Sequence, residues 1–384
     1  MKESASMTTS DRAEIVVDLS AIRHNVRLLR KTTGVQMIAV VKADGYGHGM
    51  VESARAARAA GAEWIGVATL DEAVALRRAG DEGRVLCWLT VPDEDYDEAV
   101  ATGVDVTAYS VSELDEIAAA AAATGTPARV QIKVDTGLSR GGVPAVLWNE
   151  VFRRARQGEE AGSWRVTGVW SHFACSDEPD SPLNDLQESR FQVALGAAEL
   201  AGLRPEVRHL ANSAAAILRP SSRYDAVRCG IAIYGLDPAP GHTPDLGLVP
   251  AMTVSTRLAM VKRVEAGDSV SYGATWTAEH PTSVGLVPVG YGDGVPRHAS
   301  NAAEVAVGGK RRPIRGRVCM DQFVVDLDGD LPAEGAEVVL FGAPVDGRPT
   351  AQDWAEACGT INYEIVTRIG GRMSRRYVDT EDAS

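Results

Sequence analysis

Between residues 35 and 228, short apolar and β-branched runs alternate with amphipathic stretches of helical period. This order is typical of βα units on a parallel sheet. Eight such runs favour a closed (β/α)8 barrel over an open doubly wound sheet. The predicted strands are residues 37–41, 64–68, 85–89, 104–108, 130–134, 166–170, 207–210 and 226–228; the predicted helices are residues 50–60, 71–79, 93–101, 112–123, 143–156, 182–201 and 212–218.

One further strand and helix precede this segment. Residues 14–19 have the pattern of a strand, and Asp18 or Ser20 can cap the helix that follows. The apolar face of that helix has the spacing i, i+4, i+7, at Ile22, Val26 and Leu29.

Prolines and glycines concentrate between residues 237 and 250 and indicate a domain boundary. The β-rich runs beyond it predict a smaller, mainly β domain, at residues 252–264, 283–289, 303–307, 315–327 and 337–341, with a helix only at 351–358 and the next few residues. The predicted class is α/β: a disordered tail at 1–13, a TIM-type (β/α)8 barrel at 14–249 and a C-terminal β domain at 250–384, with strand 14–19 joining the β domain.

Composition narrows the class of protein. The 384 residues carry a net charge of −13 without a basic patch, which argues against nucleic acid and anionic membranes as partners. No apolar run approaches the roughly 18 residues of a membrane span. The five cysteines are widely spaced, without a CxxC pair, and the polar N-terminus lacks the features of a secretory signal. We expect a soluble protein of the reducing cytoplasm.

Reactive side chains fall at the C-terminal ends of the predicted strands, where the chemistry of such barrels collects. They are Lys42, Arg140, His172, His209 and Arg228. Lys42 lies between apolar residues and a glycine-rich loop, a setting that lowers the pKa of an amine and suits a Schiff-base or general-base lysine.

Each of these residues also has an ordinary structural interpretation. Lys42 can extend from a strand end into solvent. His209 can be a core histidine with satisfied hydrogen bonds, and the two arginines can pair with structural carboxylates. Metal binding by His172 and Asp177 falls far short of a full ligand set, so we predict no metal site.

A phosphate group is the ligand expected after the seventh and eighth strands. Ser213 can cap a short helix and donate to phosphate, and Gly230 allows the backbone to approach closely. The sequence has no GxxxxGK[ST] loop. The residues alone therefore predict a barrel enzyme with a candidate lysine and a phosphate pocket; by itself, Tyr272 in the β domain has the pattern of an edge residue.

A set of motifs resembles the pyridoxal-phosphate-dependent alanine racemases, from about residue 14 to residue 377. The most specific is VVKADGYGHG, and the others follow in the order found in that family: KVDTGLSRGG, SHFACSDE, HLANSAA, VRCGIAIYG, VSYG, GYGDG, RVCMDQF and INYEIVTRI. The resemblance implies a pyridoxal 5′-phosphate enzyme that interconverts L- and D-alanine by a two-base mechanism and supplies D-alanine for peptidoglycan.

By this resemblance, Lys42 holds the cofactor and acts as the base for the α-proton of D-alanine, while Tyr272 is the base for L-alanine on the opposite face. His172 corresponds to the residue that hydrogen-bonds this tyrosine. Arg228 corresponds to the residue facing the pyridine nitrogen, where many pyridoxal enzymes use a carboxylate, and His209 to its partner.

The resemblance also implies two binding sets and a homodimer. The phosphate would be held by Tyr46, Ser213, the backbone at Gly230 and Ile231, and Tyr363. The substrate carboxylate would be held by Arg140 and the backbone N–H of Met320. Lys133 corresponds to a lysine that is carbamylated in some members and steadies Arg140, and Tyr272 and Met320 would reach the barrel of the partner.

Two alternatives remain open at this point. A pyridoxal enzyme of the same general plan could decarboxylate a basic amino acid, although Arg228 occupies the position where such enzymes usually place a carboxylate. A non-catalytic carrier of pyridoxal phosphate is the other; it would tolerate the loss of the Tyr272 hydroxyl.

Overall fold

The computed structural model describes residues 12–379, which fall into two units. One unit comprises Arg23–Gly45 and Gly49–Leu248, and the other comprises the described residues up to Ile22, Tyr46–His48 and those from Val249 onward. We call them the barrel unit and the β unit. Residues 1–11 of the predicted tail lie outside the described residues, while Ala13 begins the first strand.

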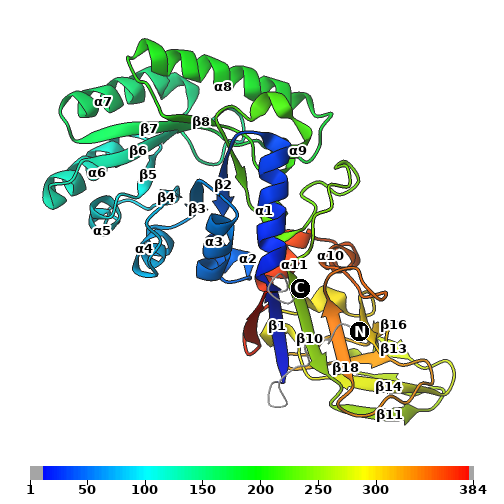
Figure 1. Ribbon diagram of the computed structural model, residues 1–384. Helices are drawn as coiled ribbons and strands as arrows, with labels where there is room; N and C mark the ends of the chain where they lie inside the picture. The colour runs from blue at the N-terminus through cyan, green and yellow to red at the C-terminus, as the bar shows by residue number, and fades with distance from the viewer. Residues whose placement is uncertain (1–11, 380–384) are drawn as a thin grey trace. The chain divides into compact units, whose positions relative to one another are not determined.

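Eight parallel strands form the barrel unit, and helices cover their outer side (Figure 1). This confirms the predicted (β/α)8 architecture. The strands are β2 (Gln36–Val40), β3 (Trp64–Val67), β4 (Arg84–Cys87), β5 (Asp105–Ala108), β6 (Ala128–Lys133), β7 (Trp164–Trp170), β8 (Val207–His209) and β9 (Ala226–Cys229). The helical segments of this part of the chain are α2 (Lys42–Tyr46), α3 (Met50–Ala59), α4 (Leu70–Arg78), α5 (Asp97–Ala101), α6 (Val111–Thr124), α7 (Trp148–Glu160), α8 (Pro182–Leu200) and α9 (Ser213–Leu218).

The barrel is nearly closed, because its first and last strands in the sheet order are joined less completely than the other neighbours. The sheet order runs β8-β7-β6-β5-β4-β3-β2-β9, so β8 and β9 face each other across the seam. Two backbone hydrogen bonds cross it, from Asp225 N to Arg208 O at 3.0 Å and from Arg228 N to Ala211 O at 2.9 Å. The shortness of β8 and β9, already visible in the sequence, explains the sparse pairing.

The interior of the barrel changes from apolar to polar along the strands. Ile38, Trp64, Leu86, Val207 and Ala226 form one buried cluster. Two residues further along β8 and β9, the next positions on the same face are His209 and Arg228, both buried. The period of two therefore puts a polar layer next to the C-terminal ends of the strands.

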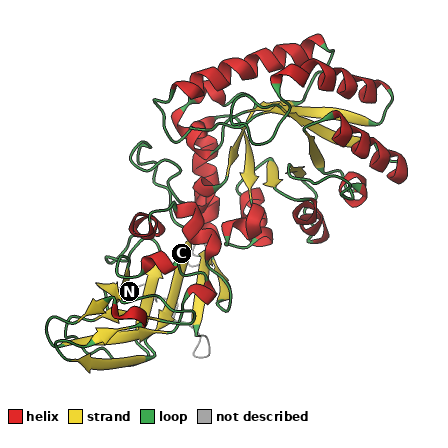
Figure 2. Ribbon diagram, turned by 180° about the vertical axis from the view of Figure 1, so that it is seen from behind, coloured by secondary structure: helices red, strands yellow, loops and turns green. Residues whose placement is uncertain are grey.

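The β unit contains one large mixed sheet and a small hairpin, as Figure 2 shows by its yellow strands. The large sheet has the order β11-β14-β17-β16-β15-β18-β10-β1-β19, and β12 pairs with β13. Its strands and helices are β1 (Ala13–Asp18), β10 (Met252–Arg257), β11 (Met260–Val264), β12 (Ser269–Val270), β13 (Trp276–Thr277), β14 (Thr282–Val287), β15 (Glu304–Val307), β16 (Lys310–Arg315), β17 (Phe323–Asp326), β18 (Glu337–Phe341), β19 (Ser374–Val378), α10 (Ala351–Cys358) and α11 (Asn362–Arg368).

The first strand belongs to this sheet. β1 pairs antiparallel with β10 and parallel with β19, so the two ends of the described chain lie side by side. Asp18 caps the following helix, α1 (Leu19–Thr33), through hydrogen bonds from Ser20 N at 2.9 Å and Ala21 N at 3.4 Å. The predicted apolar face of α1 is confirmed, since Ile22, Val26 and Leu29 are fully buried.

The sequence pattern missed the two-residue strands β12 and β13, and it also missed two longer strands that are rich in arginine. β16 has the sequence KRRPIR and β19 has SRRYV. Their arginines are used in ion pairs: Arg312 with Asp330, and Arg376 with Glu14 at 3.0 Å. The run at 315–327 is shorter as a strand than predicted, because the chain leaves the sheet after Arg315, turns at Gly316 with φ of 73°, and returns at Phe323.

No helix within residues 12–379 has both the length and the apolar character that crossing a membrane requires.

Two helical glycines give a matched test of packing in the barrel unit. A Cβ at Gly158 in α7 would overlap the ring of Trp164, whereas a Cβ at Gly196 in α8 meets no atom within 4 Å. We expect Gly158→Ala to lower the free energy of unfolding by about 1–3 kcal/mol through overpacking. Gly196→Ala should raise it by about 0.5–1 kcal/mol. Urea denaturation of both variants measures this, and equal effects would contradict the packing argument.

Candidate active site

Lys42 follows β2 and begins a left-handed turn. Ala43, Asp44 and Gly45 have φ angles of 52°, 52° and 64°. Such a conformation costs roughly 1–2 kcal/mol for each residue other than glycine. It is held by hydrogen bonds from Gly45 N to Val41 O at 2.8 Å and from Met50 N to the Asp44 carboxylate at 3.0 Å. The turn points the chain sharply away from the strand and leaves Lys42 at its end.

Glu72 also holds this turn, and sequence reasoning missed it. One carboxylate oxygen accepts from Ala43 N at 2.6 Å and the other from Ala68 N at 2.8 Å. Glu72 is the third helical residue of α4 and forms a capping box with Thr69. The TLDE sequence at 69–72 is the signal that could have revealed the cap; its second role needed the fold.

Partial burial sets the basicity of Lys42. Its pKa is lowered first by burial and then by the positive charge of Arg140, while the carboxylate of Glu72 acts in the opposite direction. The ammonium nitrogen also lies 6.0 Å from the centre of the Trp88 ring. A lysine with a lowered pKa can be a neutral nucleophile and base closer to neutral pH.

Arg228 is the centre of the polar layer. One terminal nitrogen contacts His209 Nδ1 at 2.8 Å; the other contacts His172 Nδ1 at 3.1 Å and donates to Ser171 O at 2.7 Å. Its guanidinium lies 4.6 Å from the Trp170 ring centre. Burial lowers the pKa of Arg228 to about 9, which leaves the side chain charged at neutral pH. Carbonyls and imidazoles, rather than a carboxylate, surround it.

His172 and His209 are held neutral by this setting. Burial lowers the pKa of each well below its ordinary value, and the charge of Arg228 adds to the effect. An arginine is only a donor, so each Nδ1 must accept and each neutral imidazole carries its proton on Nε2.

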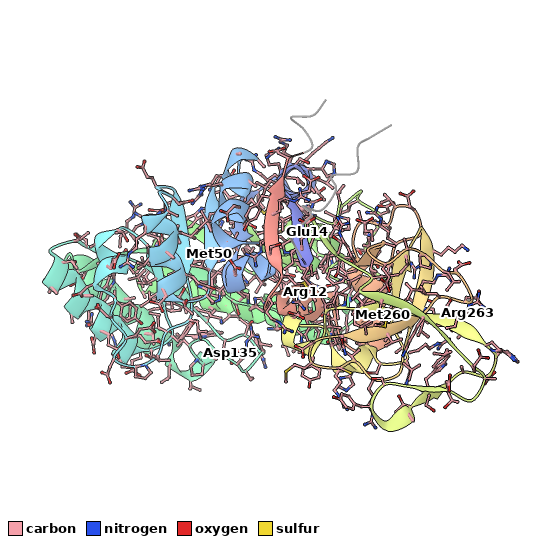
Figure 3. The ribbon with its side chains drawn as sticks, turned by 90° about the horizontal axis from the view of Figure 1, so that it is seen from below. Arg12, Glu14, Met50, Asp135, Met260 and Arg263 are labelled. Carbon is pink, nitrogen blue, oxygen red and sulfur yellow. The ribbon has the colours of Figure 1, made fainter. Side chains whose placement is uncertain are left out.

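Lys133 and Arg140 complete a group of four cations with Lys42 and Arg228. Lys133 is buried, 4.7 Å from the ring centre of Trp170; burial and the charges of Arg228 and Arg140 lower its pKa to about 8. Arg140 is exposed, on a loop at 135–142 (Asp135 is labelled in Figure 3). Burial and neighbouring positive charges lower the pKa of Lys42 and of Lys133, so this concentration of cations favours an anionic ligand.

The predicted phosphate residues of the barrel unit lie together. Gly230 N donates to Ser213 Oγ at 2.9 Å, and Ile231 follows in a buried turn. Asn212 caps α9 by accepting from Ala215 N at 3.1 Å. Gly230 N and Ser213 Oγ are thus adjacent polar groups next to β9.

The other two predicted phosphate residues, Tyr46 and Tyr363, lie in the β unit. Their ring centres are 6.3 Å apart and tilted by 52°. Gly47, which follows Tyr46 in the chain, has a φ of +83°, and a Cβ there would overlap the carbonyl of Val366. A glycine is required for this close approach of the tyrosine segment to α11.

Tyr272 and Met320 lie on one concave surface of the β unit. Their exposed fractions are 73% and 54%, and both line a cavity of about 890 Å³. Ser271, with φ of 64°, sets the direction of Tyr272, and its hydroxyl donates to Arg317 O at 2.6 Å. Large exposed apolar side chains around a hollow are typical of a binding surface.

The GYGDG loop, residues 290–294, forms hydrogen bonds to the backbone of Cys319 and Met320. Gly292 N donates to Met320 O at 2.8 Å and Tyr291 N donates to Cys319 O at 3.0 Å. A Cβ at Gly290 would overlap these carbonyls. Because the carbonyl oxygens of residues 319 and 320 face this loop, the turn that carries the Met320 N–H has one orientation.

Asp293 ties this loop to both ends of the described chain. Its fully buried carboxylate pairs at 2.9 Å with Arg12 (labelled in Figure 3) and at 2.9 Å with Arg372. Arg372 also pairs with Asp321 at 2.6 Å. Burial raises the pKa of Asp293, but the hydrogen bonds from Arg372 and Arg12 outweigh it, so the net pKa is lowered.

Comparisons with known proteins agree with this arrangement. The family model for the alanine racemase N-terminal domain matches residues 17–238, and the one for the C-terminal domain matches residues 251–377. An alanine racemase of Streptomyces coelicolor is 51% identical over 390 aligned residues, which cover 99% of this chain and 100% of that protein.

This chain belongs to the alanine racemase family. Among solved structures, the alanine racemase of Streptomyces lavendulae is 50% identical with a TM-score of 0.95, covering 97% of this chain and 98% of that one. The alanine racemase of Bartonella henselae, which contains covalently bound pyridoxal phosphate, is 28% identical with a TM-score of 0.85, over 96% and 99% of the two chains.

Within the family framework, the barrel unit brings Lys42 into one neighbourhood with the other cations and with His172 and His209. The other predicted site residues, Tyr46, Tyr363, Tyr272 and Met320, belong to the β unit. Besides Glu72, sequence reasoning missed Trp170, whose ring stacks on His209 at 5.5 Å. A tryptophan at a strand end has no special signal in the sequence.

Asp293 gives a prediction with a defined pH dependence. Because its folded pKa is lowered, Asp293 stabilises the fold above the unfolded value of about 3.9, and this contribution disappears as the pH falls through the folded pKa. We expect Asp293→Asn to lower the free energy of unfolding by about 1–3 kcal/mol at pH 7 and by much less at pH 3.

Urea denaturation at several pH values measures this difference. Asp346→Asn, at an exposed turn with φ of 53°, is the matched control and should leave stability unchanged. A loss in Asp293→Asn that is equal at pH 7 and pH 3 would contradict the ionic role.

Proposed function

We propose that this chain interconverts L-alanine and D-alanine with pyridoxal 5′-phosphate, and that the product D-alanine supplies peptidoglycan synthesis. The observation that carries the proposal is that the barrel unit holds both a partly buried Lys42 and a buried Arg228. Within residues 12–379, the hydrogen-bond partners of Arg228 are carbonyls and imidazoles and include no carboxylate. Family membership supports the same reaction, since the matched relatives are alanine racemases.

The residues of the barrel unit fit pyridoxal phosphate. The four cations favour an anionic ligand. Ser213 Oγ and Gly230 N are neighbouring polar groups that can bind a phosphate. When bound, pyridoxal phosphate withdraws electrons from the substrate and makes its α-proton acidic. We propose that Lys42 holds the aldehyde carbon, and that Ser213, Gly230, Ile231, Tyr46 and Tyr363 hold the phosphate.

Arg228 restrains this electron withdrawal. Its guanidinium donates hydrogen bonds and does not readily give up a proton, so a pyridine nitrogen facing it stays unprotonated. A weaker electron sink favours rapid return of the α-proton over side reactions such as transamination. This choice distinguishes the proposal from a decarboxylase of the same general plan.

Two bases on opposite faces invert the α-carbon. We propose that Lys42 moves the proton of D-alanine and Tyr272 that of L-alanine. An ordinary tyrosine has a pKa of about 10, so its phenolate needs stabilising. His172 suits this task, because its Nδ1 faces Arg228 and its Nε2–H remains as a donor.

The substrate carboxylate has two proposed ligands. Arg140 lies on the exposed loop of the barrel unit, and the Met320 N–H is oriented by the GYGDG loop. Lys133 has a pKa of about 8, so part of its amine is neutral, the form that reacts with carbon dioxide. A carbamate at Lys133 would replace repulsion of Arg140 with attraction.

We propose a homodimer in which Tyr272 and Met320 serve the barrel of the second copy. The support is their exposure around the cavity of about 890 Å³. We propose that the enzyme works in the reducing cytoplasm, a compartment in which cysteines such as these five remain thiols.

Lys42→Ala tests the cofactor anchor. The purified wild-type enzyme should show visible absorbance from its covalently held cofactor and should convert L-alanine to D-alanine. The variant should lose that absorbance and at least about 100-fold in activity, since a nucleophile and a base are removed together. Lys262→Ala, an exposed lysine of β11, is the control and should keep both. A wild-type enzyme with bound cofactor and no interconversion would refute the proposed function.

Tyr272→Phe tests the two-base assignment. The variant should bind the cofactor normally and lose about 100-fold or more in racemisation, the scale of one general base. In deuterated water it should still exchange the α-proton of D-alanine through Lys42 and should no longer exchange that of L-alanine. Equal exchange of both enantiomers would show that Tyr272 is not the base for L-alanine.

A further inference from the structure

Gln131 lies deep in the barrel beside the polar layer. It belongs to β6 and is fully buried. The register between β6 and β7 shifts at Val130 and Gln131, which is the mark of a bulge, and bulges redirect side chains. Opposite Gln131 stands Gly168, where a Cβ would come within 2.6 Å of the Gln131 amide. The bulge in the backbone and the glycine at position 168 both make room for the Gln131 side chain.

The Gln131 amide contacts His209 on the side away from Arg228. Its Oε1 lies 2.7 Å from His209 Nε2, while His209 Nδ1 lies 2.8 Å from the Arg228 guanidinium. His209 is fully buried and stacked on Trp170, with ring planes 13° apart. The imidazole is thus clamped between an amide and a guanidinium.

Donor and acceptor can be assigned in only one way along the contacts from Arg228 through His209 to Gln131. Arg228 can only donate, so His209 Nδ1 accepts, and a neutral ring then carries its proton on Nε2. Gln131 must therefore present its oxygen. Its Nε2 points elsewhere and has no hydrogen-bond partner among residues 12–379. A buried amide group left unsatisfied calls for an explanation, and the demand of His209 for an acceptor supplies one.

We propose that Gln131 is a positioning residue: it holds His209 in the Nε2–H form, so that Arg228 keeps an acceptor and stays directed at the cofactor ring. This rests on the proposed function only for the identity of that ring. An amide suits the task better than a carboxylate. A carboxylate would attract a second proton to His209, and a doubly protonated ring cannot accept from Arg228.

Three variants of the full-length holoenzyme test this. Gln131→Glu keeps the shape and adds charge, and Gln131→Met keeps the volume and removes the acceptor. Thr107→Val is the control. Thr107 is the register neighbour of Gln131 on β5, is also buried, and its hydroxyl has no partner in the described part of the chain. Circular dichroism and thermal unfolding select preparations that fold.

Ring nitrogen NMR of ¹⁵N-histidine-labelled protein reads the proton positions directly, with His209 assigned by its loss in His209→Gln. The wild type and Thr107→Val should show a proton on Nε2 alone. Gln131→Glu should show protons on both nitrogens, and Gln131→Met a mixture of forms. A wild-type ring protonated on Nδ1, or an unchanged ring in both Gln131 variants, would overturn the proposal.

Kinetics separate positioning from a structural role. Because Gln131 contacts neither proposed substrate ligand, KM for alanine should change little in both Gln131 variants. Because Gln131 acts on Arg228 through His209, kcat should fall about tenfold in both. That scale is the lower end of the roughly 10–100-fold losses seen when outer partners of metal-bound histidines are removed. The visible cofactor band should shift in Gln131→Glu, and unchanged kcat and absorbance in both variants would overturn the proposal. If the wild type does not racemise alanine, the proposed function fails, while the NMR result still decides the role of Gln131.

Discussion

Arg228 places a positive charge inside the barrel, and much of the site is arranged around keeping it there. A buried guanidinium without a carboxylate must satisfy its donors on neutral groups, and here carbonyls of residues 171, 209 and 210 share the task with two imidazoles. That choice determines the neutral state of His172 and His209 and the position of their protons. Together with burial, the positive charge of Arg228 also lowers the pKa of Lys133.

A second constraint is backbone strain at Lys42. Five consecutive residues, 43–47, have positive φ angles, and such a run is stable only where the surroundings hold it; here Glu72 and the Asp44 carboxylate do so. The same Glu72 caps α4, so the helix, the turn and the lysine are coupled through one carboxylate. Strain of this kind is consistent with a turn that is kept because it orients the Lys42 side chain, although it costs stability.

The β unit also holds the chain segments of its proposed site residues in place, here through hydrogen bonds and ion pairs. Met320 and Tyr272 are exposed, yet the carbonyl of Met320 accepts a hydrogen bond from the GYGDG loop, and Ser271, the residue before Tyr272, donates one to Arg317 O. Asp293 joins that loop to Arg12 and Arg372, near the two ends of the described chain. The loop behind this solvent-exposed surface is therefore anchored by one buried carboxylate with two partly exposed arginine partners.

The barrel, the β domain and the positions of Lys42, His172, His209 and Arg228 at strand ends could be predicted from the sequence, because periodicity and strand order are local and repetitive signals. The strands β16 and β19 escaped it, since their arginines pair with acids distant in the chain. The contacts of Glu72, Asp293 and Gln131 became visible only in the folded chain. Each acts through a hydrogen bond or ion pair to a distant residue, and such pairings exist only once the strands and loops have been brought together.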